Sequence, residues 1–152
     1  MNNTVTTDPV LLFLRSGGEL RVEAARLRHT AAALERRLSA TREDDAQLIQ
    51  LSRLTELRRR CEEKQQEAER QEALVSAFIE ALPTAAGRTI LRLRYCEGLR
   101  WTGGRAGHPC VLSAMHKAGL YYSERQMFRM HNQALRDARQ LFEAGGLLAV
   151  SA

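Results

Sequence analysis

LRVEAARLRHTAAALERRL, residues 20–38, carries apolar or small side chains at an alternating spacing of four and three residues. That spacing is typical of a coiled-coil helix, because it returns these side chains to one face while charged residues fill the positions between them. The face consists of Leu20, Ala24, Leu27, Ala31, Leu34 and Leu38. The pattern predicts a helix that begins after Gly17 and Gly18 and buries this face against a partner helix.

A second helix is expected from Glu43 to Leu82, roughly 60 Å long at about 1.5 Å per residue. Thr41-Arg-Glu-Asp44 resembles a capping box at its start. We predict that residues 19–82 fold as an antiparallel helical hairpin or coiled coil. Because the second helix is longer than the first, it leaves apolar positions uncovered, and we expect a homo-oligomer formed through the heptad helices. The heptad positions of the second helix are Leu48, Leu51, Leu54, Leu57, Cys61, Lys64, Ala68, Gln71, Val75, Phe78 and Leu82.

The composition favours an all-α protein. The 152 residues include 10 glycines, 3 prolines and 5% aromatic residues against 44% apolar residues, which suits helices better than a sheet with many turns. No apolar run approaches the roughly 18 residues of a membrane-spanning helix, and three cysteines at no disulfide spacing favour a cytoplasmic location. We expect residues 1–18 to form a flexible arm with a docking segment at Val10–Leu14, and residues 144–152 to form a loose tail.

The excess positive charge lies in the C-terminal half. Residues 19–82 contain 12 basic and 13 acidic side chains, whereas residues 83–143 contain 10 basic and 4 acidic ones. A compact basic region favours a polyanionic partner, and interleaved charges favour contacts between helices. Nucleic acid is therefore the leading candidate partner of residues 83–143.

Three shorter helices are expected after Leu82. Pro83 interrupts the hydrogen-bond ladder, so Thr84 can cap a helix over about residues 85–97 that ends at Gly98. A glycine-rich loop precedes the next helix, over about 109–118, and Ser123 caps the last one, over about 123–142. The positions of this last helix that are spaced for burial are Met127, Met130, His131, Ala134, Leu135, Ala138 and Leu141.

A short helix, a turn at Gly119 and a serine-capped helix form the arrangement of a helix-turn-helix DNA-binding motif. The major groove admits one helix, whose N-terminal residues meet the base edges. The candidate base contacts are Glu124, Arg125, Gln126, Arg129, Asn132, Gln133 and Arg136, and Phe128 shares their face. The candidate phosphate contacts are Arg88, Arg92, Arg94, Arg100, Arg105 and Lys117. The alternative is an ordinary amphipathic helix with a solvated polar face.

Arg94-Tyr95, Gly98, Trp101 and above all YSERQMFRMHNQAL at residues 122–135 resemble the C-terminal part of phage and prophage transcriptional regulators of the RinA/ArpU kind. Those proteins are in turn similar to the promoter-reading helix-turn-helix of sigma factor region four. The resemblance covers about residues 82–141, although 20 residues separate Trp101 from Tyr122, a longer connection than in the family's pattern.

The resemblance implies a sequence-specific regulator of transcription that is encoded by a phage or prophage and acts in the bacterial host cytoplasm. Double-stranded DNA is the implied partner, and RNA polymerase is a further candidate. Trp101 would lie in the core at the entry to the motif, and Ser123 would cap the recognition helix. Arg125, Gln126 and Arg129 would face DNA, while the residues holding that helix to the fold would be Met127, Met130, Ala134 and Leu135.

Other function classes have weaker support. A metal site is not expected, because the possible ligands Cys96, His108, Cys110 and His116 lack a zinc-type pair spacing. Neither an enzyme nor a cofactor is expected, because no nucleophile elbow, phosphate-binding loop or dinucleotide motif is found. The alternative that stays open is a coiled-coil phage assembly or packaging component whose basic half binds DNA non-specifically.

Overall fold

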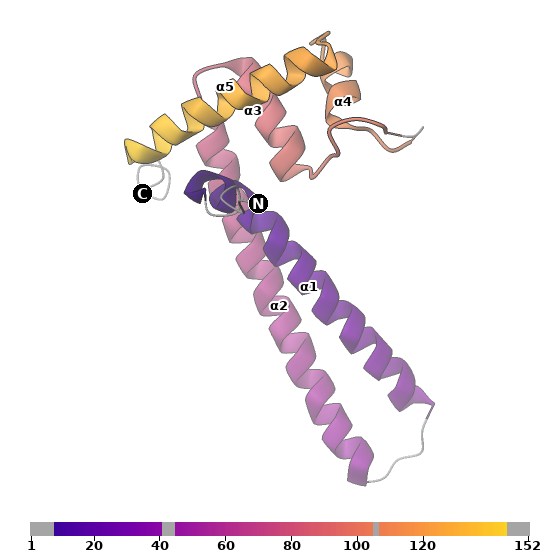
Figure 1. Ribbon diagram of the computed structural model, residues 1–152. Helices are drawn as coiled ribbons and strands as arrows, with labels where there is room; N and C mark the ends of the chain where they lie inside the picture. Colours follow the sequence, from indigo (N-terminus) through magenta and orange to yellow (C-terminus); the bar gives the residue numbers. More distant parts are fainter. Residues whose placement is uncertain (1–7, 41–44, 105–106, 146–152) are drawn as a thin grey trace, which may run out of the picture. The chain divides into compact units, whose positions relative to one another are not determined.

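The chain is helical throughout the part that the structure describes. The computed structural model describes residues 8–40, 45–104 and 107–145, and every regular element in these ranges is a helix, which confirms the all-α prediction (Figure 1). None of these helices is long and apolar enough to cross a membrane. The elements are α1 (Pro9–Ser39), α2 (Asp45–Glu80), α3 (Ala85–Leu91), the π-helix η2 (Arg92–Cys96), α4 (Val111–Lys117) and α5 (Glu124–Glu143).

The described helices belong to two compact units. Unit 1 joins the start of α1, up to Ser16, to the chain from Glu72 onward, and unit 2 is Gly17–Gln71. Both long helices therefore contribute to both units. Each unit has its own apolar cluster, so each long helix packs into one cluster along part of its length and into the other along the rest.

In unit 2, α1 and α2 lie side by side and run in opposite directions (Figure 1). The Cys61 thiol donates to the Ala24 carbonyl (3.3 Å), and Glu35 pairs with Arg58 (3.0 Å). A later residue of α1 thus contacts an earlier residue of α2, as in an antiparallel pair. The heptad faces meet in a buried cluster of Ala31, Leu34, Leu38 and Leu54, with Leu57 at its edge.

Two heptad positions at the start of α2 are not buried. Leu48 and Leu51 are exposed, and so is the neighbouring Ile49. The Gln47 side chain donates to the Leu38 carbonyl (3.1 Å) and Leu54 is buried, so the side of α2 that faces α1 carries Gln47 and Leu54 at this end. The assignment of these leucines to the heptad face is therefore wrong, because that face passes through Gln47 and Leu54 instead.

The structure differs from the sequence prediction at the start of α1. The Val10 amide donates to the Asp8 carboxylate (3.0 Å), and Pro9 suits a first helical turn because that position needs no amide donor. Burial of the segment Val10–Leu14, apart from the exposed Leu12, offsets the roughly 1 kcal/mol that each glycine costs inside a helix, so α1 continues through Gly17 and Gly18. From Pro9 onward, the expected flexible arm is helix, and its docking segment Val10–Leu14 packs into a core as predicted.

Unit 1 assembles around this apolar segment. The rings of Phe13 and Phe78 meet edge to face at 5.2 Å, and Phe142 of α5 lies against both. The Thr84 hydroxyl accepts from the Gly87 amide (3.1 Å) and caps α3, and the helical stretch of α3 and η2 ends before Gly98, whose φ is +67°. Both boundaries agree with the prediction. The expected capping box at residues 41–44 and most of the expected tail, residues 146–152, lie outside the described residues.

Candidate nucleic-acid interface

Helix α5 is anchored at its first residue and along its apolar side. Ser123 accepts from the Gln126 amide (3.2 Å), and the Gln126 side chain accepts from the Ser123 amide (2.8 Å), which satisfies two amide groups at the helix start. Gly87 of α3 faces Ala134 of α5, where an added Cβ would make an ordinary contact at 3.4 Å, but the same Cβ would lie only 2.7 Å from the Thr84 hydroxyl that caps α3. The buried residues of α5 are Met127, Ala134, Leu135 and Ala138.

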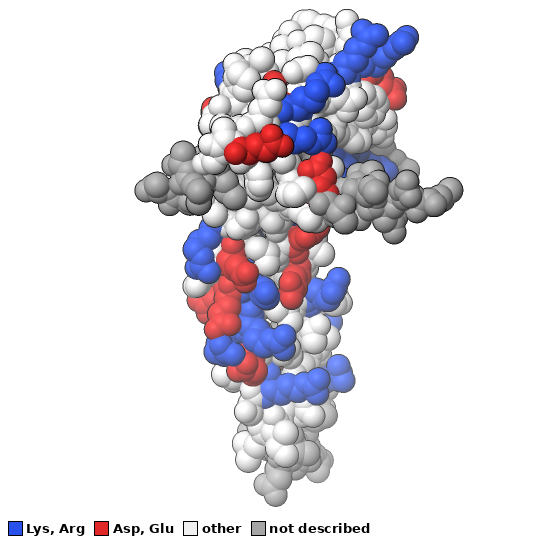
Figure 2. Space-filling view, turned by 60° about the vertical axis from the view of Figure 1, so that its left-hand side comes forward, with Lys and Arg blue, Asp and Glu red and all other residues white. Residues whose placement is uncertain are grey.

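The opposite side of α5 is exposed and polar, as predicted. Every residue assigned to this side from the sequence is exposed: Glu124, Arg125, Gln126, Phe128, Arg129, Asn132, Gln133 and Arg136. On the side of unit 1 that Figure 2 shows, a band of basic side chains has a few acidic ones beside it, whereas basic and acidic side chains are intermixed along the paired helices of unit 2.

The exposed residues of α5 fall into two groups. The side chains of Glu124, Arg125, Arg129 and Asn132 make no hydrogen bond or ion pair with any residue that the structure describes, and the last three follow one another at helical spacings of four and three. Gln133 accepts from Arg136 (2.7 Å) and donates to Asp137 (3.0 Å). The side-chain oxygen of Gln126 is occupied at the cap. Of the candidate base contacts, Glu124, Arg125, Arg129 and Asn132 therefore have the side chains most available to an external partner, and the last three can donate hydrogen bonds.

The turn between α4 and α5 is held by both backbone and side-chain bonds. Gly119 adopts a φ of +89°, which lets the Leu120 amide return to the Met115 carbonyl (2.8 Å). The His116 ring nitrogen Nε2 lies 2.8 Å from the Tyr122 carbonyl, and the His116 ring stacks on Tyr121. These bonds fix the chain directly before the Ser123 cap.

Backbone hydrogen bonds join the two ends of the long connection that follows Trp101. The Val111 amide donates to the Arg100 carbonyl (2.7 Å), and the Leu112 amide donates to the Trp101 carbonyl (3.2 Å). The start of α4 is thus joined directly to the chain at Arg100 and Trp101. Two residues of this connection, 105 and 106, lie outside the described part of the chain.

Helix α4 begins at Val111, two residues after the predicted start, because Cys110 is its cap. The thiol accepts from the Ser113 amide (3.4 Å), and the Ser113 hydroxyl accepts from the Cys110 amide (3.0 Å). Burial alone would raise the pKa of the Cys110 thiol, but hydrogen bonds from Ser113 and nearby backbone amides outweigh it and lower the pKa to about 7.

An aromatic cluster joins the chain at Trp101 to the N-terminal half of α5. The Trp101 ring lies 5.3 Å from Phe128 and 4.4 Å from His131, and the Arg94 guanidinium lies 5.0 Å above it. Trp101 is half-buried at the edge of the core, close to the position that the family resemblance implies.

The Tyr95 hydroxyl lies 2.9 Å from Nε2 of His131. Burial, together with the positive charges of Arg94 and Arg15, lowers the pKa of His131 to about 4, so its ring is neutral at physiological pH. Burial likewise raises the pKa of Tyr95. The sequence predicts that both residues face inward, but it carries no signal for their pairing.

The candidate phosphate contacts are in different environments. Arg100 and Lys117 are exposed, whereas Arg88 is half-buried and donates to the Leu82 carbonyl (2.7 Å), which stabilises the end of α2. Arg92 pairs with Glu80, and Arg94 donates to the Leu99 carbonyl (2.9 Å). Arg105 lies outside the described residues. Arg100 and Lys117 are thus freer to meet a phosphate than the three arginines of α3 and η2.

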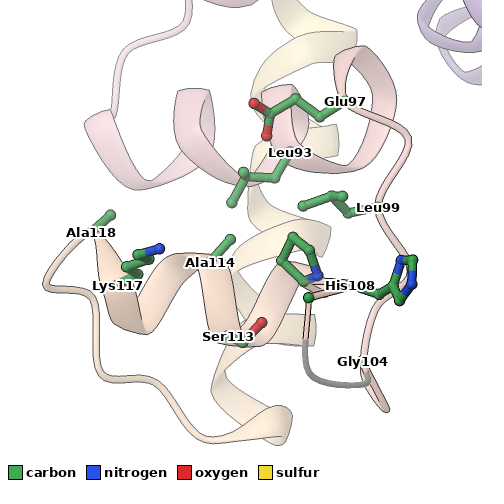
Figure 3. A pocket seen from close by; sticks show the side chains of 11 residues that line it. Leu93, Glu97, Leu99, Gly104, His108, Ser113, Ala114, Lys117 and Ala118 are labelled. Atoms are coloured by element: carbon green, nitrogen blue, oxygen red, sulfur yellow. The ribbon is translucent and has the colours of Figure 1, made fainter.

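An open groove of about 1180 Å³ runs between η2, the glycine-rich loop and α4 (Figure 3). Leu93, Leu99 and Ala114 give it an apolar surface, and Glu97 and Lys117 add one charge of each sign. No cluster of three or more metal-ligating side chains occurs among the described residues. Cys110 and His116, two of the four ligands considered from the sequence, are engaged in the capping and turn contacts described above.

Comparison of the chain with known proteins found no matching family model, no matching curated protein and no matching solved structure. The likeness to the RinA/ArpU regulators rests on the sequence residues alone.

Proposed function

We propose that this protein is a sequence-specific, double-stranded-DNA-binding regulator of transcription, encoded by a phage or prophage, in which α4, the Gly119 turn and α5 form a helix-turn-helix. One observation carries the proposal. Arg125, Arg129 and Asn132 project from one exposed side of a firmly capped helix and have no partner among the described residues.

The side chains of Arg125, Arg129 and Asn132 can form hydrogen bonds with base edges in the major groove. Arginine can donate two hydrogen bonds to guanine, and asparagine can bond bidentately to adenine. Arg125 and Arg129 lie within the first two turns, which is the part of a recognition helix that meets the bases. The partial positive charge at the start of α5 also favours an approaching phosphate.

The surrounding charge favours a polyanion. Among residues 83–143, basic side chains outnumber acidic ones by 10 to 4. Of the acidic residues on α5, Asp137 is already engaged by Gln133. A positive field of this kind raises the rate of encounter with DNA and supplies affinity that does not depend on sequence.

Unit 2 is proposed to bring two copies of the chain together as a helical hairpin. Leu48, Ile49 and Leu51 are exposed at the start of α2, and no charged residue separates them. A two-fold pair of hairpins would present two α5 helices, and such a dimer would read two half-sites. RNA polymerase, as a further partner, belongs to the same proposal.

The test is selection from a pool of random duplexes with the full-length protein, followed by affinity measurements at several salt concentrations. A regulator will enrich a defined sequence and bind it at least 10³-fold more tightly than unrelated DNA. Enrichment of no sequence, together with a steep salt dependence, would instead support the coiled-coil assembly or packaging component.

A further inference from the structure

One aromatic ring stands on the polar side of α5. Phe128 is 37% exposed and shares this side with Arg125 and Asn132, which are three residues before it and four after it. Packing covers part of the Phe128 ring, but neither that packing nor the hydrogen-bonding residues of the proposed interface account for the apolar part that stays exposed.

The Phe128 ring packs against another aromatic side chain, Trp101. It lies 5.3 Å from the Trp101 ring, and Trp101 is held by the Arg94 guanidinium above its face and by His131 at 4.4 Å. His131 is in turn bonded to Tyr95. A chain of contacts thus runs from the half-buried Tyr95 to the exposed Phe128 and limits the positions that the Phe128 ring can adopt.

The major groove offers one apolar group to such a ring. Its base edges carry hydrogen-bond donors and acceptors, and the exception is the methyl group at C5 of thymine. A cytosine methylated at C5 presents the same methyl group in the same groove. A fixed phenyl ring beside Arg125 and Asn132 could therefore cover a methyl group while its neighbours bond to adjacent base edges.

We propose that Phe128, supported by Trp101, binds the 5-methyl group of a pyrimidine and makes the preferred site of this protein depend on that group. The inference rests on the proposed function, because it needs α5 to lie in the major groove. It adds a specificity-determining contact that is apolar, whereas the contacts proposed above are hydrogen bonds.

The test changes the DNA rather than the protein fold. The duplex selected from the random pool is prepared with each thymine replaced in turn by uracil, which removes the methyl group alone, and with each cytosine replaced by 5-methylcytosine. The intact protein should lose about fourfold in affinity at one thymine, or gain about as much at one cytosine, as expected for one methyl group removed from or returned to an apolar contact. The first result identifies thymine as the source of the methyl group, and the second identifies 5-methylcytosine.

Phe128→Ala should bind thymine and uracil duplexes equally, whereas Phe128→Leu should keep part of the preference. Val22→Ala, at an exposed apolar position of unit 2, is the matched control and should behave like the intact protein. If no thymine or cytosine position responds to its methyl group, or if Phe128→Ala keeps the full response, the inference is overturned while a selected sequence still supports the proposed function. Failure to select any sequence overturns the proposed function itself, and this inference with it.

Discussion

The Tyr95 hydroxyl lies 2.9 Å from Nε2 of His131 and links η2 to α5. This contact requires a neutral, unprotonated Nε2 if the hydroxyl is to donate to it. The stability of unit 1 should therefore depend on pH.

Acidification from pH 6.5 towards 4 should weaken the fold. Burial lowers the pKa of His131 from 6.5 to about 4, so between these values the unfolded chain binds a proton that the folded chain does not. The stability that the neutral ring contributes is present above pH 6.5 and is lost as the pH falls towards 4. Allowing for its partial exposure, we expect a loss of about 1–2 kcal/mol. Denaturant unfolding at pH 7 and pH 4.5 measures it, and His131→Gln, which does not titrate, should show a smaller loss; an equal loss would assign the effect to other groups.

The ion pair between Asp8 and Arg139 should fasten the start of α1 to α5. Both Nε and Nη2 of Arg139 donate to one Asp8 oxygen, at 3.1 and 2.8 Å, while the other oxygen accepts from the Val10 amide. Asp8→Ala should lower the free energy of unfolding by about 0.5–2 kcal/mol, the usual effect of losing a helix cap. Arg139→Ala should cost less, because its side chain is partly exposed. A double-mutant cycle in denaturant tests the pair, and strictly additive losses would show that the two side chains do not interact.

Two glycine substitutions should change stability in opposite directions. A Cβ on Gly87 would lie 2.7 Å from the capping hydroxyl of Thr84, so Gly87→Ala should cost about 1–3 kcal/mol. A Cβ on Gly18, inside α1, meets nothing within 4 Å, and Gly18→Ala should stabilise by about 0.4–1 kcal/mol. Thermal unfolding followed by circular dichroism measures both. Destabilisation by Gly18→Ala would mean that α1 is interrupted at this glycine.

Self-association should depend on the exposed apolar residues at the start of α2. Replacing Leu48 and Ile49 with glutamate places two charges on this surface, so sedimentation of the variant should show monomer where the intact protein shows a larger species. Val22→Glu, at another exposed apolar position, is the matched control. If the intact protein sediments as a monomer at high concentration, the proposal that unit 2 joins two copies is contradicted.

The sequence predicts the helical fold and the two sides of α5 because both depend on local rules. Burial repeats every three or four residues along a helix, and serine capping is a short-range preference, so Ser123 and Met127 are placed correctly. The start of α1 is missed because the Asp8-Pro9 signal competes with Gly17 and Gly18, and tertiary burial decides the outcome. Leu48 and Leu51 are misassigned because they lie three and six residues before Leu54, a spacing that also fits a helical face, and only the contact of Gln47 with α1 shows which face is used.

The sequence predicts which residues make up the candidate site, but it does not predict the hydrogen bonds among them. The periodicity identifies which α5 residues are exposed, whereas it cannot show that Gln126 is used at the cap or that Gln133 holds Arg136. The bonds from Val111 and Leu112 to the carbonyls of Arg100 and Trp101 involve backbone groups alone, and backbone bonds between distant positions leave no side-chain pattern to read. The same is true of the contact between Trp101 and Phe128.

The central claim is that the N-terminal half of α5 reads DNA, and arginine substitution in the full-length protein tests it most directly. Binding to the selected duplex and to a scrambled duplex is measured for Arg125→Ala, Arg129→Ala and Arg26→Ala. Arg26, an exposed arginine of unit 2, is the matched control for loss of one positive charge. Each α5 variant should lose about 1–3 kcal/mol on the selected duplex and discriminate less against the scrambled one, while Arg26→Ala keeps both properties. If folded Arg125→Ala and Arg129→Ala proteins keep the affinity and the base preference of the intact protein, α5 does not read DNA.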